Sequence, residues 1–159
     1  MPKRSRKPYD ERTELEKIQS QWVKLTGLHD RTDWSAAVVR AATAAELAVN
    51  FAIRREFATR SQFDKDFVDG LLKWANGIAG KIRNLLLPLL RDGAQHDAVK
   101  ALCTRADKIN DRRNGIAHRG EFCSKATSAA LIAECETFVH GIVRLYEGGF
   151  TLKERPAQK

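Results

Sequence analysis

Apolar residues recur every three or four positions almost from one end of this chain to the other, which is the period of an amphipathic α-helix. Only four prolines and ten glycines occur among the 159 residues, so few positions interrupt regular structure. No stretch is predicted to form a strand. The sequence therefore predicts an all-α protein, an up-and-down bundle of four to five helices with short connections.

The first two predicted helices have recognisable ends. The first begins at a capping box formed by Thr13 and Glu16, and Gly27 is expected to end it. The second starts near Asp33 and runs to about Phe57. Its many alanines would let a neighbouring helix approach closely.

Three further apolar stripes follow. The third stripe is Phe63, Phe67, Trp74, Ile78, Ile82, Leu85 and Leu89 on one helical face, and Pro88 should end or kink that helix. The fourth stripe is Val99, Leu102, Ala106, Ile109, Arg113 and Ile116. The last stripe is Leu131, Cys135, Phe138, Ile142 and Leu145, with a stop expected at Gly148-Gly149.

The net charge of +8 is concentrated at the two ends of the chain. Residues 1–8 contain four basic and no acidic residues, and residues 151–159 contain three basic residues against Glu154, which leaves +2 on the rest. We therefore expect a flexible basic arm over 1–8, one helical domain over 9–150 and a flexible tail over 151–159. Such an arm can bind nucleic acid without reading its sequence, but short basic termini are more often only solvated.

Composition also predicts a cytoplasmic protein that does not enter a membrane. The cysteines are three, without CxxC spacing, as expected of reduced thiols rather than of disulfides or a zinc site. No apolar run approaches the roughly 18 residues needed to span a bilayer. The basic start leads into Pro8-Tyr9-Asp10-Glu11 rather than into a hydrophobic signal segment.

Arg113 is the anomaly of the fourth stripe, because it falls in phase with side chains that should face other helices. A cation on such a face is costly unless it has a partner or lies at a water-filled groove. Either Arg113 forms a structural ion pair, with Glu46 of the second helix as a candidate, or it lines a site.

Arg113 also opens the segment Arg113-Asn114-Gly115-Ile116-Ala117-His118, which combines a permanent cation, an amide and an imidazole. The spacing alone is weak evidence, since Arg91 and His96 repeat it in a predicted turn after Pro88. What distinguishes the second occurrence is its context. Asn114 follows the arginine, Arg119-Gly120 follows the histidine, and the last helix comes next.

This segment, Arg113-Asn114-x-x-x-His118-Arg119-Gly120 near the end of a penultimate long helix, resembles the motif of the HEPN (higher eukaryote and prokaryote nucleotide-binding) family. The helical pattern over about residues 10–147 is similar to the bundle of that family. The resemblance implies a homodimeric endoribonuclease that needs no metal or other cofactor. It assigns cleavage to Arg113 and His118 and a phosphate or active-site hydrogen bond to Asn114. Many members are toxins or phage-defence effectors, which makes an antitoxin a possible partner.

The residue chemistry agrees with RNA as the substrate. Cleavage by the ribose 2′-hydroxyl needs a base for its proton, a cation for the phosphorane charge and an acid for the leaving 5′-oxygen, and it leaves a 2′,3′-cyclic phosphate. One His–Arg pair cannot serve as both acid and base, so we expect a two-fold dimer with a composite active site. Arg112 and Arg119 could widen the phosphate-binding groove or could simply be exposed charges.

Two other functions stay open. A catalytically inactive module of the same fold could bind RNA, a nucleotide or a protein partner through the Arg113 groove. A helical transcription regulator would gain support only from the basic arm, because no helix-turn-helix is recognised.

Overall fold

The central element is a long alanine-rich helix, α2 (Trp34–Arg60), which contacts the helices before and after it in the chain. The computed structural model describes residues 7–60 and 63–154. The remaining helices are α1 (Glu14–Asp30), α3 (Lys65–Trp74), α4 (Gly77–Lys81), α5 (Leu87–Leu89), α6 (His96–Arg119) and α7 (Lys125–Val143). A 3-10 turn, η1, covers Tyr9–Glu11, and a π-helical turn, η2, covers Ile82–Leu86. No strand occurs in the described ranges, so the all-α prediction is confirmed.

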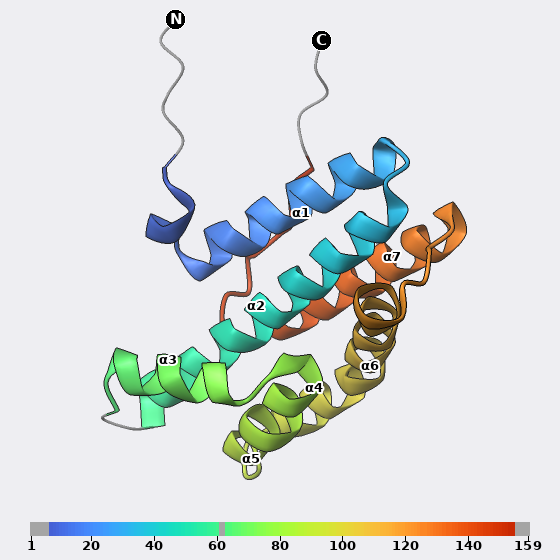
Figure 1. Ribbon diagram of the computed structural model, residues 1–159. Helices are drawn as coiled ribbons and strands as arrows, with labels where there is room; N and C mark the ends of the chain where they lie inside the picture. Colours follow the sequence, from blue (N-terminus) through green and yellow to red (C-terminus); the bar gives the residue numbers. More distant parts are fainter. Residues whose placement is uncertain (1–6, 61–62, 155–159) are drawn as a thin grey trace, which may run out of the picture.

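The helices form two consecutive pairs joined by a shorter helical segment. α1 and α2 lie side by side with α7 behind them, and α6 runs up to the start of α7 (Figure 1). α3, α4 and α5 connect α2 to α6 along the lower side of Figure 1. One core formed by α1, α2, α4, α6 and α7 therefore supports the end of α6, where the Arg113–His118 segment lies.

α1 begins as predicted and ends later. The Glu16 N–H donates to Thr13 Oγ1 at 3.2 Å and the Thr13 N–H donates to Glu16 Oε2 at 2.7 Å, which confirms the capping box. The stop at Gly27 is wrong, because the helix continues to Asp30. His29 Nδ1 lies 2.9 Å from Ser128 Oγ of α7, and this tertiary contact holds the extra turn.

α2 packs against both α1 and α7, and its buried alanines are Ala37, Ala41, Ala42, Ala44, Ala45, Ala48 and Ala52. The Cys135 thiol of α7 lies 3.3 Å from the carbonyl oxygen of Ala41 and is fully buried. Burial raises the pKa of this thiol to about 12. By length and hydropathy α2 could also cross a membrane, but 61% of its most apolar window is buried inside the protein, as in the core helix of a bundle.

The prediction that the third apolar stripe forms one continuous helical face is wrong. α3 ends at Trp74, and Gly77, the first residue of α4, adopts a left-handed φ of 78°, so α4 does not continue the helical phase of α3. As a result Ile78 is buried while Trp74 is 74% exposed. Further along, the π turn ends at Leu86, two residues before Pro88, which has no N–H to donate back along the helix.

The C-terminal end is packed beyond the predicted domain boundary at residue 150. α7 ends at Val143, before Gly148-Gly149, and Tyr146 Oη donates to the buried Glu56 carboxylate at 2.7 Å. The Leu152 N–H donates to His140 Nε2 at 3.1 Å, and the Lys153 N–H donates to Gln19 Oε1 at 2.8 Å. These contacts tie the first part of the expected flexible tail to α1 and α7. The rest of that tail and most of the basic arm lie outside the described residues.

The close packing of α2 against α1 and α7 leads to a stability prediction. Ala45→Leu would force extra methyl groups among the buried alanines, so we expect the free energy of unfolding to fall by about 1–3 kcal/mol. Urea denaturation measures this change. Ala58→Leu, on the exposed side of the same helix, is the matched control and should change the unfolding free energy by less than about 0.5 kcal/mol. Equal effects of the two substitutions would contradict the close packing.

Candidate functional site

The Arg113–His118 segment lies inside an unbroken helix. α6 continues through the buried Gly115 to Arg119 and ends because Gly120 takes a left-handed conformation with φ 65°. The Glu121 N–H then donates to the Gly115 carbonyl at 3.1 Å, which closes the helix end. The alternative left open by the sequence, a turn at Gly115 that folds His118 back onto Arg113, does not occur.

Helical geometry sets the directions of the motif side chains. At about 100° per residue, Asn114 and His118 lie about 40° apart on one face, whereas Arg113 and His118 lie about 140° apart. Arg113 is half-buried and donates from Nη1 to Asn114 Oδ1 at 3.0 Å. His118 is exposed and makes no hydrogen bond or ion pair with any other described residue. Arg113 and Asn114 are therefore linked by a hydrogen bond, whereas His118 only shares a helix face with Asn114.

The expected ion pair between Arg113 and Glu46 is not formed. Glu46 Oε1 accepts from Lys81 Nζ at 2.7 Å, and Lys81 is 5% exposed. A buried ammonium needs a counter-charge more than a half-buried guanidinium does, which explains this pairing. Glu46 consequently supports α4 rather than Arg113. Arg113 has no carboxylate partner among the residues that the structure describes.

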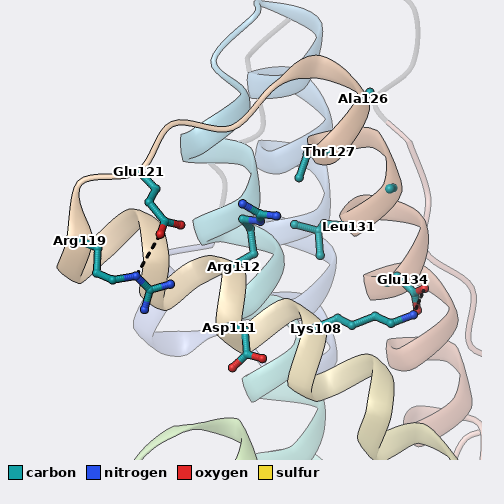
Figure 2. A pocket seen from close by; sticks show the side chains of 10 residues that line it. Lys108, Asp111, Arg112, Arg119, Glu121, Ala126, Thr127, Leu131 and Glu134 are labelled. Carbon is teal, nitrogen blue, oxygen red and sulfur yellow. Dashed lines mark hydrogen bonds and ion pairs between the residues drawn. The ribbon is translucent and has the colours of Figure 1, made fainter.

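Arg112 and Arg119 lie on a different side of α6, about 20° apart around the helix. Both line an open groove of about 800 Å³ between α6 and α7 (Figure 2). We call it the α6–α7 groove, and it is lined by Lys108, Asp111, Arg112, Arg119, Glu121, Ala126, Thr127, Ala130, Leu131 and Glu134. Neither Arg113 nor His118 lines it, so the structure separates the predicted site residues into two groups.

Three carboxylates, those of Asp111, Glu121 and Glu134, balance the charges of Lys108, Arg112 and Arg119 in the α6–α7 groove. Glu121 Oε1 accepts from Arg119 Nε at 3.0 Å, and Glu134 accepts from Lys108 at 3.3 Å (Figure 2). Glu134 also accepts from Arg105 at 2.6 Å. The hydrogen bond from Arg105 lowers the pKa of the Glu134 carboxyl. Arg112 forms no ion pair with another described residue, so no carboxylate of the described chain is paired with its charge. Burial raises the pKa of the nearby Cys123 thiol, and the Arg112 charge opposes that rise.

Sequence reasoning missed Glu121, although Gly115 carries a signal for it. A Cβ atom at position 115 would clash with Glu121 Oε2, so glycine lets this carboxylate fold over the helix without having to move. Glu121 thereby reaches Arg119. A glycine in the middle of a predicted helix indicates a close neighbour, but the sequence does not say which residue approaches.

Metal ligands and comparisons with known proteins add no further assignment. Within the described ranges, no group of three or more His, Cys, Asp or Glu side chains is placed to hold a metal ion. No protein family, curated protein or solved structure matches the chain. Any functional conclusion must therefore come from the residues themselves.

The charge balance of the groove can be tested with a polyanion. Glu121→Gln releases Arg119 and adds one positive charge inside the α6–α7 groove, so we expect elution from heparin at higher salt. Glu136→Gln is the matched control, because this exposed glutamate of α7 does not line the groove. We expect a clearly smaller shift for the control. An equal shift for both variants would show that only net charge matters.

Proposed function

We propose that the protein is a metal-independent endoribonuclease with a HEPN-like helical bundle, acting in the cytoplasm as a homodimer. The observation that carries this proposal is the exposed imidazole of His118 on the same face of α6 as Asn114. Asn114 is in turn hydrogen-bonded to Arg113, whose guanidinium has no carboxylate partner in the described part of the chain. Both the cation and the imidazole are thus free to engage a substrate.

The proposed reaction uses the nucleophile of RNA itself. A histidine takes the proton of the ribose 2′-hydroxyl as the O2′–P bond forms, and a second proton donor protonates the 5′-oxygen as the P–O5′ bond breaks. Arg113 offers donors to the phosphate oxygens while negative charge develops on them. The products are a 2′,3′-cyclic phosphate and a free 5′-hydroxyl, and no metal ion takes part.

A second chain would bring to one phosphate the cation, base and acid that a single chain cannot gather there. Arg113 and His118 point about 140° apart on one straight helix, and one imidazole cannot be base and acid in the same step. A two-fold axis beside the ends of two α6 helices would place two histidines and two arginines around one phosphate. An RNA-cleaving toxin or defence effector, held in check by an antitoxin, is the cellular role that we propose.

A second candidate, a binding module without catalysis, is favoured by one feature. Arg112 lies free in the α6–α7 groove, away from His118, so an anionic ligand could bind there without any proton transfer. The cleavage experiment below separates the two functions, because the module would bind RNA and leave it intact.

The catalytic assignment predicts the effects of substitutions at the motif. Arg113→Ala and His118→Ala should each lower the cleavage rate by about 10²- to 10⁴-fold in EDTA, because each removes a group that stabilises the transition state. Gel analysis of RNA with a 2′,3′-cyclic phosphate assay measures the rate and the product ends. Arg91→Ala and His96→Ala repeat the same spacing elsewhere and should retain full activity. Loss of wild-type cleavage in EDTA, or full activity of His118→Ala, would disprove the assignment.

The composite site predicts a non-linear loss of activity in mixed dimers. Wild-type and His118→Ala chains are refolded together in equal amounts, so that the subunits exchange. If both histidines of a dimer are needed, activity falls to about one quarter of the wild-type value, whereas independent sites retain about one half. Circular dichroism of the mixture checks that both chains refold. Activity that follows the wild-type fraction linearly would contradict the two-chain site.

A further inference from the structure

Phe122 is the most exposed large apolar side chain in the described ranges, with 93% of its surface accessible. It lies in the loop that leads from Gly120 at the end of α6 to Ser124 before α7. An isolated apolar side chain at a surface needs no explanation by itself. Phe122 differs because the residues on either side of it in the chain keep its side chain exposed to solvent.

The residues on both sides of Phe122 are anchored to the bundle. The Glu121 N–H donates to the Gly115 carbonyl, and the Glu121 side chain pairs with Arg119. On the other side, Cys123 is buried and its N–H donates to Ser35 Oγ of α2 at 3.0 Å. With both neighbours turned inward, the phenyl ring is held outward, and its exposure does not come from a loose loop.

The segment that contains Phe122 is rich in positive charge. From Arg112 to Lys125 the chain contains four basic residues and one acidic residue, Glu121, which is paired with Arg119. The exposed aromatic residues of α3 have different surroundings, because Phe67 stacks on Phe63 at 4.4 Å between ring centroids and lies beside Asp64 and Asp66. The exposed aromatic residues of α3 would therefore be a better contact for an apolar protein partner than Phe122 would be. A single unstacked ring among cations suits a ligand with both aromatic faces and negative charges.

Single-stranded RNA has both features, since its bases offer aromatic faces and its backbone offers phosphates. We propose that Phe122 stacks on an unpaired base next to the phosphate that His118 contacts, and so restricts the enzyme to single-stranded RNA. The two residues are four positions apart in the chain, which keeps their Cα atoms within about 14 Å of each other. The inference rests on the proposed function, because it places the base relative to the cleaved phosphate.

Binding to an RNA that cannot be cleaved tests the inference. A 2′-O-methyl single-stranded oligonucleotide lacks the nucleophile, so its affinity reports binding alone. Phe122→Ala should weaken binding by roughly 5- to 150-fold, which is the usual effect of losing one base-stacking ring. Phe122→Trp should retain binding, because indole also stacks. Trp74→Ala, which removes another highly exposed aromatic ring far from the motif in sequence, is the matched control and should bind like wild type.

An oligonucleotide with abasic sites separates stacking from other effects. Wild type and Phe122→Ala should bind the fully abasic strand equally, because no base remains to stack. The inference is overturned if wild type and Phe122→Ala bind the intact strand with equal affinity. It is also overturned if Phe122→Ala weakens binding to the abasic strand as much as binding to the intact strand, or if sedimentation shows that this substitution dissociates a dimer. Wild-type chains that do not cleave RNA but lose binding through Phe122→Ala would refute the proposed nuclease alone. Cleavage by wild type with unchanged binding by Phe122→Ala would refute the stacking role alone.

Discussion

The row of buried alanines in α2 is the constraint on which the rest of the fold depends. Because these positions carry only methyl groups, α7 approaches α2 until the Cys135 thiol reaches the Ala41 carbonyl. α7 in turn supports α6, and the loop between them is tied to Ser35 of α2. The position of the Arg113–His118 segment therefore follows from packing that is remote from any chemistry.

The continuity of α6 determines what one chain can do. Had the helix ended at Gly115, Arg113 and His118 could have turned toward one another in a single subunit. Gly120 ends it five residues later, and the two side chains stay on separate faces. Asn114 accepts a hydrogen bond from Arg113 and shares a helix face with His118. A straight helix thus makes a complete site within one chain difficult and gives the proposed dimer a physical reason.

The sequence predicted those features that depend on neighbouring residues. The capping box of Thr13 and Glu16 and the course of α2 follow from local spacing and propensity. Features that depend on distant contacts were missed. Lys81 is buried and pairs with Glu46, so the expected Glu46–Arg113 ion pair does not form, and this partner choice could not be seen in the sequence. The division of the candidate site into two faces also escaped prediction, because the sequence could not show whether Gly115 ends the helix.

The charge pattern at the end of α6 follows from the helix itself. The carbonyl end of a helix carries partial negative charge and repels a phosphate, in contrast to the N-terminal end, which attracts one. A phosphate-binding site at this end must therefore bring its own cations, and Arg112, Arg113 and Arg119 fall within the last two turns. Glu121 neutralises Arg119, so Arg112 and Arg113 remain to offset the carbonyl end. Basic residues in the last turns also stabilise a helix by offsetting its dipole, so the same arginines would serve both the end of α6 and the proposed anion site.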